Sequence, residues 1–199
     1  MIKHRLLFLL IYLVPVTLFG QRIDRKMRIK LKVMNLKFEI PKHFTELDSG
    51  KLFPCGDAKI LSTMFYTIIN RDSTIRIGLA ALEPTKPKDL EWIKKHFNPN
   101  FDPNKNYLRT AYSHADTVHH QLVFYSKEYS KQKFNADDSG EYSRNCTLPF
   151  EGKYNNHKIV FMAKRNRGHV ELSYFYTDAA RDRIDKVIKN TAGMIKFLD

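Results

Sequence analysis

The sequence has few of the residues that mark fibrous, low-complexity or disulfide-dense proteins. Its 199 residues include eight Gly, eight Pro and two Cys, which excludes a collagen-like repeat, a Pro/Gly-rich disordered chain and a cysteine-stapled mini-domain. It also lacks a GxSxG elbow and an HExxH pair, the motifs around which many hydrolases and zinc enzymes are built. The sequence therefore indicates an ordinary globular fold without a recognisable catalytic motif.

Long hydrophobic runs are also scarce, and the longest lies at the N-terminus. A basic start at residues 3–5 precedes an apolar stretch from Leu6 to Phe19, which is the layout of a secretory signal peptide. The stretch is shorter than the roughly 20 residues of a membrane-spanning helix. We therefore expect a signal peptide over residues 1–20 and a periplasmic or secreted bacterial protein that is not integral to the membrane. An uncleaved N-terminal anchor is the alternative.

The rest of the chain, residues 21–199, suits one domain of ordinary size. Apolar residues make up 43% of the sequence and aromatic residues 13%. This proportion is enough to fill one core and too high for a disordered chain. We therefore expect a single folded domain after the signal peptide.

Basic residues outnumber acidic ones, and much of the excess lies in one short segment. After residue 20, 32 Lys and Arg oppose 21 Asp and Glu, a net charge of +11. Residues 21–37 alone hold seven basic residues and one acid, a net charge of +6. Ile29, Leu31 and Val33 alternate with lysines in this segment, which predicts a strand with one apolar and one basic face.

Four residues of this segment, Arg28, Lys30, Lys32 and Lys37, permit two interpretations. Such a cluster attracts anionic surfaces, for example lipid head groups or acidic polysaccharide. Lysines along an edge strand also prevent pairing with another chain. Nucleic acid, a common partner of basic proteins, is not expected for an exported chain.

Strand patterns dominate the remainder of the sequence. The apolar positions move to even numbers at Leu36, which predicts a turn or bulge near residues 34–35. Two β-branched and aromatic stretches around Asn70-Arg71-Asp72-Ser73 predict a hairpin. The strands are expected over residues 29–33, 36–40, 60–69, 75–82, 107–113, 117–129, 142–150, 157–163 and 169–177, with a polar loop over 131–141.

Two segments carry the periodicity of a helix. Pro87 leads the first, over residues 87–97. Asp178 caps the second, which is expected to run to the end of the sequence. Its apolar stripe consists of Ile184, Ile188, Thr191, Ile195 and Leu198. Together these elements predict an α+β fold with a central, mostly antiparallel β-sheet and helices packed on its faces.

The order of these elements resembles the PsbP-like family. The likeness rests on an opening strand that ends in Phe38-Glu39-Ile40-Pro41, a middle helix led by Pro87 and a last helix that finishes Ala192-Gly193-Met194-Ile195-Lys196-Phe197. The resemblance implies an α/β/α sandwich of the kind found in non-enzymatic accessory proteins of exported or organellar compartments. It rests on no functional motif, so no functional residue is carried over to this chain.

The two cysteines and one histidine-rich segment hold the remaining candidate chemistry. In an exported protein Cys55 and Cys146 are expected to form a disulfide, while a reactive Cys55 thiol and two free thiols are the alternatives. His114, Asp116 and His120 are possible zinc ligands by residue type, but their spacing fits no known pattern. We expect solvated histidines, no metal and no cofactor.

These observations favour an exported, non-catalytic binding or accessory protein whose partner is another protein or an anionic surface. The alternative is a small exported hydrolase that uses Cys55 or the His114–His120 region. A paired-carboxylate site at Asp137 and Asp138 is conceivable, but adjacent acids in a polar segment usually form a solvated turn.

Overall fold

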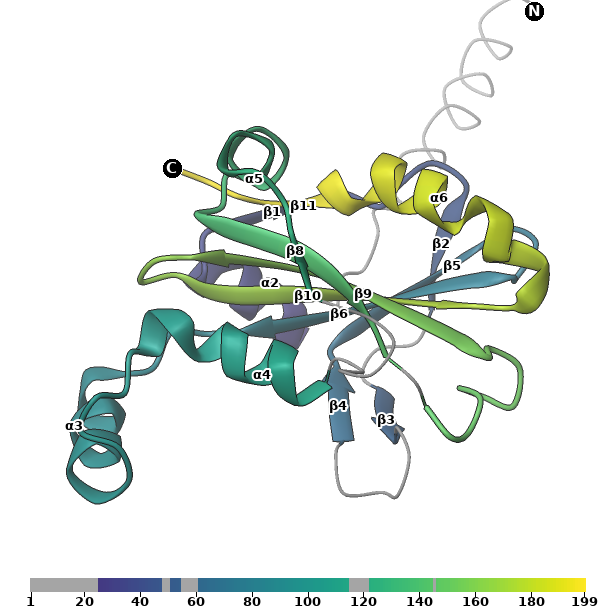
Figure 1. Cartoon of the computed structure of the whole chain (residues 1–199). Helices are drawn as coiled ribbons and strands as arrows, with labels where there is room; N and C mark the ends of the chain where they lie inside the picture. Colours follow the sequence, from purple (N-terminus) through teal and green to yellow (C-terminus); the bar gives the residue numbers. More distant parts are fainter. Residues whose placement is uncertain (1–24, 48–50, 55–60, 115–121, 145) are drawn as a thin grey trace, which may run out of the picture.

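The computed structural model describes residues 25–47, 51–54, 61–114, 122–144 and 146–199. Its centre is a seven-stranded antiparallel sheet (Figure 1). From one edge to the other, the strands are β2 (Phe44–Leu47), β5 (Tyr66–Asn70), β6 (Ile75–Leu82), β10 (Gly168–Tyr176), β9 (Asn156–Lys164), β8 (Asp138–Ser143) and β7 (Val123–Phe124). Helices lie over both faces of this sheet, which confirms the predicted α+β class.

One face of the sheet carries the main hydrophobic core. Two helices, α5 (Lys127–Phe134) and α6 (Ile184–Thr191), lie over this face (Figure 1). Alternate residues of β10 point into the core, so that Val170, Leu172 and Tyr174 are each 0% exposed. Burial of these side chains supplies most of the force that holds the layers together.

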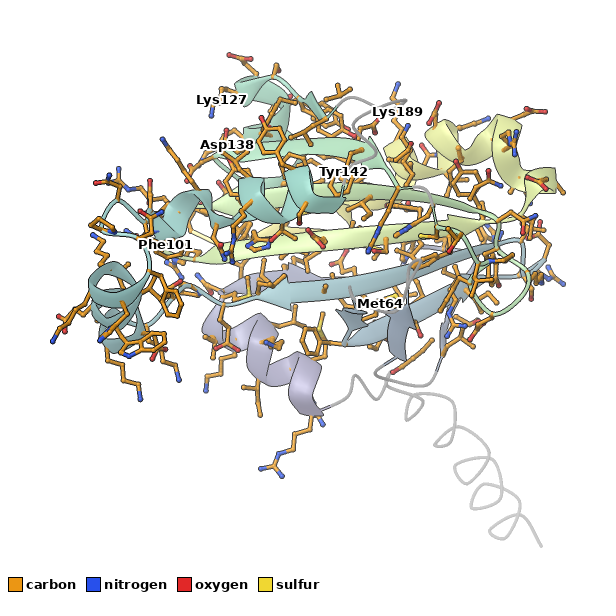
Figure 2. All side chains as sticks on the ribbon, turned by 60° about the horizontal axis from the view of Figure 1, so that its bottom comes forward. Met64, Phe101, Lys127, Asp138, Tyr142 and Lys189 are labelled. Carbon is orange, nitrogen blue, oxygen red and sulfur yellow. The ribbon has the colours of Figure 1, made fainter. Side chains whose placement is uncertain are left out.

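The opposite face of the sheet combines apolar and polar side chains. It is partly covered by α4 (Asn106–His114), which lies across the strands in the foreground of Figure 2. Tyr107 and Ala111 of α4 pack against Phe161 and its neighbours on the sheet. Both faces of the sheet are covered, which explains why the sequences of the central strands are nearly continuous apolar runs.

Two short strand pairs complete the fold. The first joins β1 (Leu36–Phe38) to β11 (Ile195–Phe197), with Leu36 opposite Phe197. The second joins β3 (Lys51–Pro54) to β4 (Leu61–Met64).

The remaining helices lie on or near the surface. They are α2 (Arg25–Val33), α3 (Pro87–His96) and the 3-10 turns η1 (Pro103–Lys105), η2 (Asp178–Arg183) and η3 (Ala192–Met194). No residue of α3 is buried, and the segment with Phe101 joins it to the next helices (Figure 2).

Several local predictions are confirmed. The chain turns at residues 34–35, where Asn35 has φ 52°. The hairpin of β5 and β6, the helix led by Pro87 and the hairpin of β9 and β10 occur where they were expected. Gly168 ends the last of these turns with φ +92°, and a Cβ there would lie 2.2 Å from the backbone oxygen of Leu82. Glycine is therefore required at this position.

The predicted strand over residues 29–33 is wrong, because this segment belongs to the helix α2. Ile29 and Val33 are each 52% exposed, whereas Met27 and Met34 are fully buried. Met27, the partly buried Leu31 and Met34 are spaced by four and three residues, which is the period of a helix face. The alternation of Ile29, Leu31 and Val33 only imitates a strand.

The segment between residues 106 and 143 also differs from the prediction. Residues 106–114 form α4, in which the buried Tyr107 and Ala111 are four residues apart. The predicted loop over 131–141 instead holds the end of α5 and the start of β8. Ser126 caps α5 by accepting a hydrogen bond from the Tyr129 backbone, and Asn135 ends it with φ 50°. Serine and asparagine are typical of these two positions.

The C-terminal helix is shorter than predicted. Residues 178–183 form η2, α6 covers Ile184–Thr191, and the chain then leaves the helix at η3. Ile184 and Ile188 are buried as expected, at 5% and 4% exposure. Ile195 is also buried, but as a residue of β11 opposite Phe38. Pairing with β1 therefore outweighs the helical periodicity of the last residues.

Candidate functional site

The basic segment forms the most positively charged element described in the structure. The helix α2 carries Arg25, Lys26, Arg28, Lys30 and Lys32 and no acidic residue. Arg28 and Lys32 are exposed, and neither forms an ion pair with any residue that the structure describes. Ile29 and Val33 are exposed beside them. This outer face is therefore both basic and partly apolar.

The other two predicted basic residues already have acidic partners. Lys30 lies on the flank of α2, where its Nζ is 3.2 Å from Glu83 Oε1 and 4.5 Å from the ring centre of Phe65. Lys37 lies on β1 and forms an exposed ion pair with Glu39 at 2.7 Å. Arg28 and Lys32 thus lie one helical turn apart on α2, whereas Lys37 belongs to β1.

Of the two cysteines, only Cys146 lies in the described part of the chain. It is partly buried against the cluster of Met64, Phe150, Tyr154 and Phe175, and its Sγ lies 3.9 Å from His157 Nδ1. Cys146 is not a free cysteine. Cys55 lies outside the described residues, so its predicted pairing with Cys146 stays a prediction.

Two of the three candidate zinc ligands lie outside the residues that the structure describes. His114 is the last residue of α4, while Asp116 and His120 lie in residues 115–121, which the structure does not describe. Within the described ranges no three His, Cys, Asp or Glu side chains gather closely enough to hold a metal ion.

The adjacent acids Asp137 and Asp138 have separate partners. Asp137 accepts a hydrogen bond from the Arg165 backbone at 2.7 Å, and Asp138 forms an ion pair with Lys127 at 2.5 Å. Figure 2 shows Asp138 and Lys127 on the same side of the molecule. Asp137 is exposed and lies in a bend, whereas Asp138 begins β8, so the predicted solvated turn holds for Asp137 alone.

A buried acid on β10 was not singled out from the sequence. Glu171 is 6% exposed and accepts a hydrogen bond of 3.5 Å from the Tyr142 hydroxyl. Burial raises the pKa of Glu171 to about 7, although the positive charge of Arg144 acts in the opposite direction. Burial also lowers the pKa of Arg144. This face of the sheet therefore holds two titratable groups in a poorly solvated environment.

A small polar cleft, here called the Asn–His cleft, lies at one end of the sheet. Three segments form it: the chain after β6, the start of α4 with the preceding η1, and the turn between β9 and β10. Its volume is about 260 Å³. The lining residues are Glu83, Pro84, Thr85, Pro87, Pro103, Asn104, Asn106, Tyr107, Lys164, Asn166, Gly168 and His169.

Two residues that line this cleft each hold a fully buried polar atom without a hydrogen-bond partner among the described residues: Nε2 of His169 and Oδ1 of Asn106. His169 is only 5% exposed, and burial lowers the pKa of its imidazole to about 4. The imidazole is therefore neutral at pH 7. Unpaired buried polar atoms are rare in proteins and call for an explanation.

A wider cleft of about 560 Å³ adjoins the first. Both are lined by Asn104 and Tyr107, and the wider one also reaches Asp137, Asp138 and Arg165. The backbone N–H of Asn166 donates to Asn104 Oδ1 at 2.8 Å, which ties the β9–β10 turn to η1. This hydrogen bond fixes Asn104, a residue that both clefts share.

In the described part of the chain, no helix combines the length and the apolar composition needed to cross a bilayer.

Comparisons with known proteins give one structural similarity. No protein-family model and no curated protein matches the sequence. The structure is similar to the solution structure of cyanobacterial PsbP (CyanoP) from Synechocystis sp. PCC 6803, with a TM-score of 0.44 and 8% sequence identity. The match covers 88% of this chain and 89% of that chain. That protein bears the name of the family that the sequence resembles, but a similarity at this level does not assign the chain to it.

Proposed function

We propose that this chain is an exported, non-catalytic binding protein that attaches to an anionic membrane surface through α2. One observation carries the proposal: the outer face of α2 presents Arg28 and Lys32 together with the exposed apolar side chains of Ile29 and Val33. Basic amphipathic helices bind in this way, with cations at the lipid head groups and apolar side chains at the acyl boundary.

The apolar residues favour a membrane over an acidic polysaccharide. A polysaccharide offers negative charge but no apolar layer for Ile29 and Val33, whereas a lipid surface offers both. The earlier alternative, protection of an edge strand, does not apply to Arg28, Lys30 and Lys32, because they lie on a helix.

Two features of the titratable groups favour binding over catalysis. A general base works best when its pKa lies near the working pH, and the pKa of His169 is about 4. The pKa of Glu171 is about 7, but its side chain is 6% exposed and accepts a hydrogen bond from Tyr142. Neither group is suited to proton transfer with a bound substrate.

Reversing the exposed charges of α2 should weaken vesicle binding. Each basic residue near an anionic bilayer contributes about 1 kcal/mol, so Arg28→Glu with Lys32→Glu should lower affinity at least about tenfold. Binding is measured by co-sedimentation with phosphatidylcholine vesicles that do or do not contain phosphatidylglycerol. Wild-type binding should require the anionic lipid and weaken as salt is added.

The matched control is Lys94→Glu with Lys95→Glu, which makes the same charge change on the exposed last turn of α3. This variant should bind nearly as well as wild type. Equal weakening by both pairs would show that only net charge matters. Binding to an acidic polysaccharide but not to vesicles would contradict the membrane assignment.

Because we propose that the protein is exported to an oxidising compartment, we also propose a disulfide between Cys55 and Cys146. It is supported by the even number of cysteines and by the fact that Cys146 is not free. Closure of a loop of about 90 residues adds up to about 4.5 kcal/mol to the free energy of unfolding in the chain-entropy model. Thiol titration of the unfolded, unreduced protein should find no free sulfhydryl, and a result of two would contradict the pairing.

A further inference from the structure

We propose that the C-terminal half of α3 is a docking surface for a partner protein that presents an apolar pocket with acidic residues around it. The surface, here called the Trp92 patch, consists of Trp92, His96 and Phe97. This inference is independent of membrane binding by α2, because it rests on a different helix and on different side chains.

The Trp92 patch is a cluster of three neighbouring rings. The ring centre of Trp92 lies 5.2 Å from that of His96 and 5.0 Å from that of Phe97. Trp92 is 54% exposed and Phe97 is 72% exposed. Aromatic residues are enriched in protein interfaces, and tryptophan is enriched among the few residues that dominate their affinity. The patch therefore has the composition of an interface centre.

The rings of the patch do not serve the folding of this chain. No residue of α3 is buried, and the helix lies away from the central sheet (Figure 1). A helix of ten residues gains little stability by itself and usually depends on the packing of one face. A partner that covers the exposed rings supplies this packing.

Hydrogen bonds hold the patch in one arrangement. His96 Nδ1 donates to the backbone oxygen of Trp92 at 2.9 Å, because a carbonyl oxygen only accepts. The backbone N–H groups of Phe97 and Asn98 both donate to the Ile93 oxygen, at 2.9 and 3.1 Å. A surface that is fixed before binding loses little conformational freedom when the partner docks.

The charges favour an acidic partner over a second copy of this chain. Lys88 and Lys95 lie four residues before and three residues after Trp92, which places them on its side of the helix. Both are exposed, and neither forms an ion pair with a residue that the structure describes. Two copies of a chain with a net charge of +13 repel each other, whereas acidic residues on a partner are attracted.

A lipid surface suits α3 less well than it suits α2. The helix α3 holds Asp89 and Glu91, which an anionic bilayer repels, whereas α2 holds no acid. Asp89 lies three residues before Trp92 and therefore on the same side of the helix. A protein surface can place groups opposite charges of both signs, so we assign the Trp92 patch to a protein.

The test begins with photo-cross-linking of the full chain in cells that produce it naturally. The photoreactive analogue p-benzoylphenylalanine replaces Phe97 in one form and the similarly exposed Leu148, at 65%, in a control form. We expect the first form, but not the control, to cross-link to an acidic protein.

The captured protein is then purified and titrated into this chain labelled with 5-fluorotryptophan. Because the sequence has one Trp, the fluorine NMR spectrum has a single tryptophan signal, which reports on the patch. We expect this signal to shift in a saturable way. More partner should be needed as salt is added, because salt screens the attraction between lysines and acidic residues.

Variants measured by titration calorimetry separate a central contact from the surrounding charges. Trp92→Ala should lower the affinity at least about thirtyfold, as for a residue that dominates an interface. Its melting temperature should stay close to that of the wild type, because the side chain is exposed. Lys95→Glu should lower the affinity about fivefold. Lys94→Glu is the matched control, because Lys94 lies off the Trp92 side of the helix, and it should bind nearly like the wild type.

Three results would overturn the inference. They are cross-linking at position 97 to lipid, to a second copy of this chain or to nothing, a captured protein that leaves the Trp92 signal unchanged, and an affinity that Trp92→Ala does not alter. Arg28→Glu with Lys32→Glu, the variant expected to lose vesicle binding, should bind the partner like the wild type. Failure of the Trp92 patch and failure of the proposed function are therefore distinguishable.

Discussion

Relative to the wild type, Glu171→Gln should gain about 3 kcal/mol in the free energy of unfolding as the pH rises from 4.5 to about 8. Burial raises the folded-state pKa of Glu171 from 4.5 to about 7, and the Arg144 charge and the Tyr142 hydrogen bond only partly oppose this. Because its pKa is higher in the folded than in the unfolded state, the carboxyl contributes stability that is fully present below pH 4.5. This contribution is lost as the pH rises through 7. Glutamine stays neutral and loses nothing.

His169→Phe should show the opposite dependence. Burial lowers the folded-state pKa of His169 from 6.5 to about 4. As the pH falls from 6.5 to 4, the unfolded chain takes up a proton that the folded protein does not, so the wild type loses about 3 kcal/mol that the variant keeps. Between pH 4.5 and 6.5 the contributions of Glu171 and His169 change in opposite directions, so the stability of the wild type should depend little on pH there.

Urea melts of both variants and the wild type across this pH range provide the measurement. The exposed His96→Phe is the control, and its curve should run parallel to that of the wild type. If the curves of Glu171→Gln or His169→Phe were parallel to the wild type as well, the buried group concerned would titrate normally and its assignment would be wrong.

Phe161→Ala should lower the free energy of unfolding by about 3–5 kcal/mol, the usual cost of deleting a buried aromatic ring. Phe161 is 1% exposed and lies between sheet and helix, with its ring centre 5.6 Å from that of Tyr107 and 5.7 Å from that of Phe124. Its removal leaves a cavity beneath α4. The change should appear as a lower urea midpoint with an unchanged slope.

Phe97→Ala is the matched control, because this ring is 72% exposed. It should change the free energy of unfolding by less than about 0.5 kcal/mol. A loss below about 1 kcal/mol for Phe161→Ala would contradict the tight packing of this ring between α4 and the sheet.

Elements whose signals are local could be predicted from the sequence. The hairpin around Asn70-Arg71-Asp72-Ser73 and the helix led by Pro87 each combine a clear period with residues typical of their ends. The segments 29–33 and 107–113 could not, because short alternating stretches fit a strand as well as a helix. Only burial of Met27, Met34 and Tyr107 in the folded chain decides between the two.

The candidate sites differ in the same way. The basic character of Arg28 and Lys32 was visible in the sequence, although their placement on a helix was not. The Asn–His cleft was not predicted, because three segments far apart in the sequence form it. The available signals were polar residues inside apolar strands: His169 and Glu171 interrupt the run of β10, and a residue of that kind has to be paired or used.

The pairing of β1 with β11 affects how the protein folds. Asn35 donates a side-chain hydrogen bond to the backbone of Asp199 across a separation of 164 residues, and Leu36 faces Phe197 in the strand pair. Contacts between such distant residues slow folding, because a long loop must close before they form. The main core also stays incomplete until Ile195 and Phe197 join it. A chain emerging in order from its first residue would thus lack Ile195 and Phe197 in its main core, and the partner of β1, until β11 is available.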